Sequence, residues 1–500
     1  MKRIAIIGSG LSGLLCGNLL AKKGHKVTIF ESHVRPGGYT AGFWREGFYF
    51  ESGTLALEST PSVNKAMEDV GLKDKVEFVR QRMRIIAREY DYIPKSYEDV
   101  KQVFLNTFVA DRAKLERFFG DLDEIVNAIP FTGKPMPVMY EGPEYEAAMQ
   151  EMMRSGMKFM EALGKIGDVT ASEFVGRYFE KGSRLFSLLV SGGYPDQAAW
   201  IMAASFKGFL EDYWTVKKGM QFWADTLAAR FKEFGGELKL RSPVEKIVTR
   251  DGQAEGIVSK GERFPADYVI SCGDYKKTML ELLDDKSLIS AETCERIRNA
   301  AVSEAFFVVY LGLDIHEDEL LRLMKVPLVF YRPDGPDVDF SDTKDEAYFA
   351  KTGCQIYSPS LINPELAPKE KSSLMIETMS PTGWMDDWGG GNREEYKRLK
   401  SLAATGMIET AAQLIPNLKE KIILKDAATP LTFERYTHNT KGASSSWSWN
   451  PRKRFYPDMR SRGTITPVKN LFIGSCWSTQ IGGIPGAISG AYEAMKQVAE

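Results

Sequence analysis

The stretch KRIAIIGSGLSGLLCGNLLAKKGHKVTIFE, residues 2–31, decides the fold. It reads as an apolar strand at 4–7, a GxGxxG turn at 8–13, a helix over 11–23 and a second strand at 27–30. Gly8 allows the tight turn, Gly10 lets the backbone approach a diphosphate, and Gly13 lets the helix lie close to the strand. The helix N-terminus favours an anion, because its first N–H groups are unpaired. We assign a dinucleotide site to Gly8, Ser9, Gly10, Leu11, Ser12, Gly13 and Glu31.

Composition limits the partners and the compartment. The chain of 500 residues exceeds one compact core, so we expect two intertwined domains. Its net charge of -2 gives no broad attraction for nucleic acid or an anionic membrane. Five scattered cysteines indicate a reducing compartment, and four histidines without ligand spacing argue against a metal site. No segment has the ~20 apolar residues that span a bilayer. We expect a cytoplasmic protein, and a peripheral contact with the inner face of the membrane stays open.

The acid at Glu31 can bind both ribose hydroxyls and would repel a 2′-phosphate, but NAD and FAD enzymes can share this unit. Residues 32–39, SHVRPGGY, bring a second glycine pair to the diphosphate and a cation, Arg35, to its charge. This segment resembles the dinucleotide-binding extension of FAD-dependent oxidoreductases of the amine oxidase and phytoene desaturase superfamily. Residues 47–54, GFYFESGT, are similar to the next element of that superfamily, with Glu51 where Asp is usual. The resemblance implies FAD contacts from Ser32, Arg35, Gly37, Gly38, Tyr39, Gly53 and Thr54.

Two later blocks resemble the same superfamily. Residues 218–271 read as a helix over 221–234 and then short strands, and the resemblance places Val244 beside the adenine. Residues 470–491 read as a strand, a glycine-rich turn and a helix with Pro485 near its start. This end is similar to the terminal flavin motif of carotenoid desaturases, carotenoid isomerases and retinol saturases, although Gln480-Ile481 replaces a common Pro-Gly pair and Ser475 a common acid. The resemblance implies flavin contacts from Gly474, Ser475, Gly483 and Ile484.

The four blocks predict an α/β fold, in which a Rossmann-type FAD-binding domain with a mostly parallel sheet and a β-meander carries an inserted α+β substrate domain. We expect the FAD-binding domain in three pieces, at 1–74, 213–294 and 456–500. We expect the substrate domain in two pieces, which are a helical part rich in Met and aromatic residues at 75–212 and a second part at 295–455.

Residues between the blocks give weaker signals. Methionines recur at helical spacing within 145–163, which favours a stripe facing the core, with a stripe that lines substrate or faces lipid as the alternative. Trp384, Trp388 and the glycines at 389–391 suggest a covering loop. Residues 429–437, TPLTFERYT, resemble the segment that leads to the flavin-facing part of the substrate cavity. Tyr436, His438 and Trp447 are the best cavity candidates, with a packing role equally open for each.

The function expected from the resemblance is an FAD-dependent oxidoreductase acting on C–C or C=C bonds of a long apolar polyene or isoprenoid lipid. Hydride exchange at flavin N5 would serve desaturation, saturation or double-bond isomerisation, with an external electron donor or acceptor. One alternative is an amine oxidase-like enzyme, whose aromatic cage Tyr436, Trp447 and Trp449 could imitate. A non-catalytic prenyl carrier of the Rab escort type is another, and the intact glycine set argues against it. The substrate, the reaction direction, the catalytic residues and the oligomeric state stay open.

Overall fold

The nucleotide-binding sequence blocks build a five-stranded parallel sheet. In a computed structural model that describes residues 1–129, 133–190, 196–332, 340–457 and 462–499, the strand order is β19-β13-β1-β2-β9. The strands are β1 (Arg3–Ile7), β2 (Lys26–Phe30), β9 (Glu237–Lys239), β13 (Tyr268–Ser271) and β19 (Leu471–Ile473). The sheet therefore joins segments from the start, the middle and the end of the chain. The predicted mostly parallel sheet is confirmed.

Three helices pack together against one face of this sheet: α1 (Leu11–Lys22), α9 (Met220–Glu233) and α18 (Gly483–Ala499). The middle one, α1, is buried on every side from Leu11 to Ala21, because α9 and α18 both contact it. This explains why its leucines show no single apolar face. The helices predicted at 11–23 and 221–234 are confirmed within one residue at each end.

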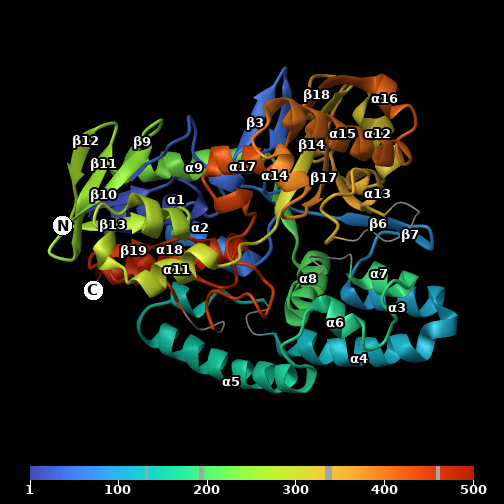
Figure 1. Cartoon of the computed structure of the whole chain (residues 1–500), viewed down its shortest axis with the longest axis horizontal. Helices are drawn as coiled ribbons and strands as arrows, with labels where there is room; N and C mark the ends of the chain where they lie inside the picture. The colour runs from blue at the N-terminus through green and yellow to red at the C-terminus, as the bar shows by residue number, and fades with distance from the viewer. Residues whose placement is uncertain (130–132, 191–195, 333–339, 458–461, 500) are drawn as a thin grey trace.

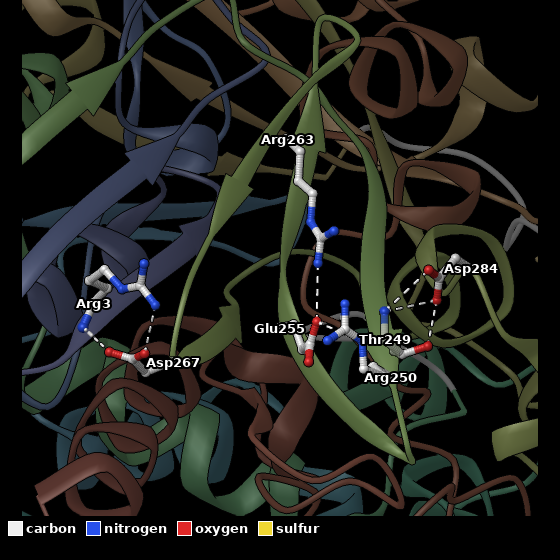
Figure 2. Close-up of polar contacts among 7 residues, drawn as sticks. All are labelled: Arg3, Thr249, Arg250, Glu255, Arg263, Asp267 and Asp284. Carbon is white, nitrogen blue, oxygen red and sulfur yellow. Dashed lines mark hydrogen bonds and ion pairs between the residues drawn. The ribbon is translucent and has the colours of Figure 1, made fainter.

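The opposite face of the sheet carries a separate antiparallel meander, made of β10 (Val244–Arg250), β11 (Gln253–Ser259) and β12 (Glu262–Pro265). Ion pairs tie its strands together, since Glu255 contacts both Arg250 and Arg263 (Figure 2). A second pair fixes the return to the main sheet, where the backbone N–H and guanidinium of Arg3 donate to Asp267 at 2.7 and 3.0 Å. The meander is thus locked to β1 and β13.

A second, mainly antiparallel sheet has seven strands in the order β18-β14-β17-β16-β15-β6-β7. Its strands are β6 (Met83–Ala87), β7 (Tyr90–Tyr92), β14 (Ala305–Leu313), β15 (Leu328–Tyr331), β16 (Cys354–Tyr357), β17 (Ser372–Ser380) and β18 (Ile422–Ala428). The apolar run AFFVVYLGL at 305–313 predicts a buried strand, and β14 has these bounds. Strands from both predicted insertions thus share one sheet, while the exact domain boundaries stay predictions.

The outer face of the seven-stranded sheet packs against α12 (Glu317–Met324), α13 (Tyr348–Lys351) and α15 (Arg393–Ala412). Trp384 and Trp388 lie in this core, at 0% and 2% exposure, with ring centroids 4.7 Å apart. The expectation that they belong to a covering loop is therefore wrong. Their rings pack against the aromatic rings of Phe349 in α13 and Phe307 in β14.

The inner face looks toward a layer of helices, which lies below both sheets in Figure 1. These are α3 (Tyr97–Thr107), α4 (Arg112–Ala128), α5 (Gly142–Ile166), α6 (Ala171–Val175), α7 (Arg184–Val190) and α8 (Ala199–Glu211). The buried residues of α5 are Phe159, Ala162 and Ile166. Met153, Met157 and Met160 are 55%, 65% and 57% exposed. The favoured core-facing methionine stripe is therefore wrong, because the methionines lie on the opposite side of the helix.

Shorter elements connect these layers. They are β3 (Gly42–Arg45), β4 (Phe48–Glu51), β5 (Phe78–Arg80), β8 (Trp214–Val216), α2 (Thr60–Asp69), α11 (Ala291–Asn299), α16 (Leu418–Lys421) and α17 (Pro430–Thr437). Helix α17 begins with a capping box, in which Thr429 accepts from the N–H of Thr432. The Thr-Pro pair of the segment at 429–437 is therefore a helix start, with Pro430 at its first position.

The contact between α1 and β1 makes a stability prediction. A Cβ on Gly13 would lie 2.0 Å from the carbonyl oxygen of Gly8, so Gly13→Ala must push the helix off the strand. We expect the free energy of unfolding to fall by about 1–3 kcal/mol, the cost of overpacking, together with loss of bound flavin. Urea unfolding measures the first effect and absorbance of the purified protein the second. The control is Gly120→Ala on α4, where open space surrounds the new methyl group, and it is expected to leave the protein as stable or slightly more so.

Candidate functional site

Two glycine loops meet at the N-terminus of α1. The N–H of Gly37 donates to the carbonyl of Ser9 at 2.9 Å, and Gly10 and Gly37 form a parallel bridge. A Cβ on Gly38 would come within 3.2 Å of the Gly10 Cα. Within the described residues no side chain caps the first turn of α1, whose N-cap residue is Gly10. The two loops therefore form a cradle of bare backbone N–H groups, which fits a diphosphate.

The Glu31 carboxylate fixes both loops from behind this cradle. One of its oxygens accepts from the N–H and hydroxyl of Ser9 at 2.8 and 2.7 Å. The other accepts from the N–H of His33 at 2.8 Å and the hydroxyl of Ser32 at 3.2 Å. Glu31 is 8% exposed, so these bonds are shielded from water. The acid predicted to bind ribose thus also holds the shape of the turn.

Arg35 and Val244 flank the same end of the sheet. The guanidinium of Arg35 donates to the carbonyl of Gly42 at 2.9 Å, which directs this side chain toward β3. Val244 opens β10, two residues after Ser242, whose N–H donates to the carbonyl of Glu31 at 2.6 Å. The meander therefore starts beside the acid. This position suits the predicted adenine contact, which stays a prediction.

The C-terminal block joins the end of β13. The N–H of Gly474 donates to the carbonyl of Ser271 at 2.8 Å, and the hydroxyl of Ser475 donates to the carbonyl of Gly273 at 2.9 Å. Gly482 and Gly483 follow with φ of 67° and 57°, and Ile484 lies in the first turn of α18. This turn places the start of α18 beside the strand ends of the sheet.

Two serine hydroxyls next to this turn have no hydrogen-bond partner in the part of the chain that the structure describes. The hydroxyls of Ser445 and Ser446 are buried, and among the described residues neither finds a donor or acceptor. A Cβ on Gly482 would lie 2.4 Å from the Ser445 hydroxyl oxygen. Buried unpaired hydroxyls are costly, and they are paired when a polar ligand binds beside them. Together with the glycine cradle, these residues fit the polar groups of a flavin dinucleotide.

Tyr39, Gly53 and Thr54 lie together on the side that faces the second sheet. The N–H of Thr54 donates to the carbonyl of Tyr39 at 2.9 Å, and the Tyr39 hydroxyl donates to the carbonyl of Gly442 at 2.9 Å. All three line a small cavity of about 70 Å³ that Glu377 also lines. The structure thus brings these three predicted FAD contacts together at the border of the seven-stranded sheet.

The three weaker cavity candidates have different surroundings. Tyr436 is 52% exposed and contacts the His33 ring at a centroid distance of 5.4 Å. His438 ends α17 with φ of 59°. Trp447 is fully buried, stacks on Phe455 at 3.9 Å and donates to the carbonyl of Trp477 at 2.9 Å. None of the three lines the large cavity that is described below, so the structure places them in packing or surface roles.

Glu51 has a clear role that its sequence position did not reveal. Its carboxylate accepts from the N–H of Met220 at 3.1 Å and from the hydroxyl of Tyr49 at 2.7 Å. It therefore binds the first turn of α9, and the pattern gave no signal for this because the partners lie 169 residues apart. Burial raises the pKa of the Glu51 carboxyl to about 8, although both hydrogen bonds act to lower it.

A large cavity, about 2620 Å³ in volume, lies between the helical layer and the seven-stranded sheet. Its apolar wall includes Met83, Phe104, Phe159, Trp200, Phe306 and Phe330. Met149, Met152, Met153 and Met160 of α5 also line it, which agrees with the substrate-lining reading of the methionine stripe. The cavity is also lined by Gly53 and Thr54 and, from the C-terminal block, by Ile481 and Pro485. It therefore opens onto both predicted flavin-side segments.

The fold and the cradle together define a dinucleotide-binding oxidoreductase scaffold with an apolar substrate cavity. The family model for flavin-containing amine oxidoreductases matches residues 11–316. The chain belongs to this family. The predictions of an FAD-dependent oxidoreductase and of the α/β Rossmann-type fold are thereby confirmed, while the roles of individual residues stay predictions.

Named relatives cover nearly the whole chain. A 4,4'-diapophytoene desaturase from Methylomonas is 26% identical, over 91% of this chain and 88% of its own. An all-trans-retinol 13,14-reductase from Danio rerio is 24% identical, over 97% of this chain and 84% of its own. Among solved structures, putrescine oxidase bound to putrescine is 14% identical, with a TM-score of 0.65 over 100% of this chain and 99% of its own. This last likeness shows the shared fold.

Two absences hold for the part of the chain that the structure describes. Its His, Cys, Asp and Glu residues form no group of three or more that could hold a metal ion. No helix in these ranges combines the length and apolar character needed to cross a membrane.

Glu51 makes the stability of the protein depend on pH. Its folded pKa of about 8 lies above the ordinary value of 4.5, so the folded state holds this proton more tightly than the unfolded chain. The stabilisation is complete below about pH 4.5 and is lost as the pH rises through 8. We expect urea unfolding midpoints to fall between pH 5 and about 9 in the wild type, and to fall less in Glu51→Gln. The control is Glu46→Gln in the exposed turn between β3 and β4, and a profile unchanged in Glu51→Gln would contradict the assignment.

Proposed function

We propose that this flavoenzyme acts on C–C or C=C bonds of a long apolar polyene or isoprenoid lipid, by desaturation, saturation or double-bond isomerisation. The observation that carries the proposal is the cavity of about 2620 Å³ with its wall of aromatic residues and methionines. Apolar walls favour an apolar ligand because binding removes both surfaces from water. Methionine side chains adapt to irregular shapes, which suits a long chain with several bends.

Different parts of the site would bind the two ends of the cofactor and the substrate. The glycine cradle and Glu31 would hold the ADP end of the cofactor, and the bound flavin supplies hydride exchange at N5. The segments at 53–54 and 481–485 lie on the cavity wall, so they would hold the reacting end beside the substrate. The helical layer and the seven-stranded sheet would exclude water from the reacting carbons. An external electron donor or acceptor completes the cycle.

Of the three aromatic residues expected to form an amine oxidase cage, Trp449 lines the large cavity, and Tyr436 and Trp447 do not. A cage for an organic cation needs aromatic faces around one point. Trp447 is fully buried in the core below the meander, whereas Tyr436 is half exposed on α17, so these two do not face a common point. Desaturases, prolycopene isomerases and retinol reductases among the relatives also support the polyene reading. The carrier alternative is disfavoured by the complete glycine cradle, which such a protein does not need.

A substrate panel tests the proposal on the purified, flavin-loaded protein. We expect linear C30–C40 polyenes, at different levels of saturation, or retinoids to be converted, with hydride exchange visible as bleaching or recovery of flavin absorbance under anaerobic conditions. Product analysis then separates desaturation, saturation and isomerisation. Rapid flavin reduction by simple amines, with no conversion of any polyene by oxidised or reduced enzyme, would overturn the proposal.

We also propose that the protein is cytoplasmic and takes up its substrate at the inner face of the membrane through α5. This helix lies along the outer edge of the molecule in Figure 1. Met153, Met157 and Met160 recur on it at helical spacing and are more than half exposed, while Met153 and Met160 also line the cavity. An exposed apolar stripe that continues into an apolar cavity offers a lipid a path that avoids water.

A single methionine tests this membrane contact. Met157 is 65% exposed and lies outside the cavity wall, so Met157→Gln should weaken binding to the bilayer and leave conversion of detergent-dispersed substrate unchanged. Co-sedimentation with neutral phosphatidylcholine vesicles measures the binding, for which we expect a loss of several-fold. Leu321→Gln on α12, 44% exposed in the outer helices, is the matched control. Equal sedimentation of wild type and Met157→Gln would contradict the proposal.

A further inference from the structure

Glu377 brings a carboxyl group to the cavity wall from the seven-stranded sheet, whereas the acids Glu58 and Glu304 line the same cavity from outside that sheet. Glu377 is in the central strand β17, where it pairs with Val308 of β14 and Gln355 of β16. The neighbouring cavity-facing residues of this sheet include Phe306, Phe330 and Met83. Glu377 and Gln355 are paired on the adjacent strands β17 and β16, and both line the cavity. They therefore form a polar pair among apolar side chains of this sheet, in which Figure 1 shows β17.

Glu377 is buried without a partner. The residue is 5% exposed, and among the described residues no donor makes a hydrogen bond or an ion pair with its carboxyl group. Burial alone raises the pKa of this carboxyl to about 8, so near neutral pH the acid is mostly protonated. The Glu377 carboxyl interacts electrostatically with the phenol of Tyr310 on β14, and the phenol of Tyr39 lines the same small cavity. Both phenols are neutral at that pH, so neither compensates a charge.

The fold does not require a carboxyl group in this position. Glu51, another buried acid, accepts hydrogen bonds from Met220 and Tyr49, and Glu31 is held by four donors. The Glu377 carboxyl instead faces the cavities, and the apolar surroundings favour its neutral form. A leucine at this position would complete the apolar wall, so the carboxyl group points to a role in chemistry.

The position of Glu377 joins the two parts of the site. It lines the large apolar cavity, and it also lines the small cavity that contains Tyr39, Gly53 and Thr54. Those three are the residues predicted to lie on the flavin side. Glu377 is therefore at the junction where the reacting carbons of a bound substrate would meet the redox group.

We propose that Glu377 is a catalytic proton donor and acceptor that acts on the substrate carbon next to the one exchanging hydride. The assignment rests on the proposed function. In desaturation, one carbon gives a hydride, with its two electrons, to the oxidised flavin. The adjacent carbon loses a proton to the deprotonated form of Glu377, which predominates only at alkaline pH, and the electron pair of that C–H bond forms the new C=C bond. In saturation, the carboxylic acid gives this proton back while the carbon beside it receives hydride from reduced flavin.

The matched variants are Glu377→Gln, which keeps the volume and removes the acid, and Glu377→Asp, which keeps the acid. We expect the single-turnover rate of polyene conversion to fall by about 100-fold or more in Glu377→Gln, the usual contribution of a general acid or base, and to fall less in Glu377→Asp. The control is Asp426→Asn on the edge strand β18 of the same sheet, where the partly exposed carboxyl pairs with Arg45, and this variant should convert polyene at the wild-type rate. Flavin absorbance verifies that each variant is loaded equally.

An infrared measurement on the loaded protein without substrate gives a second readout. We expect the difference spectrum, wild type minus Glu377→Gln, to contain a protonated-carboxyl band at neutral pH that is sensitive to D₂O, while the absorption of Glu51 is common to both proteins and cancels. Equal turnover by wild type and Glu377→Gln, or no difference between their infrared spectra, overturns the assignment while the proposed function stands. If the loaded wild type converts no polyene, the proposed function fails and the proton-transfer step falls with it.

Discussion

The close contact between α1 and the end of β1 is the constraint on which the rest of the structure depends. A methyl group at Gly13 would overlap the Gly8 carbonyl, so this helix can start only where the strand ends. That start directs bare N–H groups into the space between two glycine loops, and Glu31 fixes those loops by accepting four hydrogen bonds. Because α9 and α18 both pack on α1, the middle and the end of the chain are positioned by the same helix. One backbone contact therefore sets the place of every segment that can meet the cofactor.

The sequence predicted most reliably what local chemistry determines. The strand at 305–313, the helix starting at Leu11 and the parallel sheet follow from apolar runs, glycines and caps that act over a few residues. The prediction that the methionine stripe of α5 faces the core is wrong, because periodicity shows that a helix has an apolar face and does not show what covers that face. Here Phe159, Ala162 and Ile166 supply a second apolar face that packs on the other helices.

The candidate site residues also divide into those set by local sequence and those brought together only by the fold. The cofactor cradle is built by residues close in sequence, so the motif alone located Gly8, Gly37 and their neighbours. The cavity is built by side chains from segments hundreds of residues apart, and Glu377 is recognisable only once β14, β16 and β17 pair. In the sequence it is one acid among 67 acidic residues. Trp447 was chosen for its residue type, and aromatic type alone cannot separate a cavity wall from the core of stacked rings where it lies.

The separation of the two halves has a consequence for specificity. The cradle holds a part of the cofactor that is the same in every reaction, so its residues are under a fixed geometric demand. The cavity wall draws on the seven-stranded sheet and on the helical layer. Substitutions there can change the length and polarity of the ligand without disturbing the Gly13 contact. An apolar wall also makes any carboxyl within it unusually basic, since burial favours its neutral form. The same enclosure that selects an apolar substrate therefore tunes an acid for proton transfer beside it.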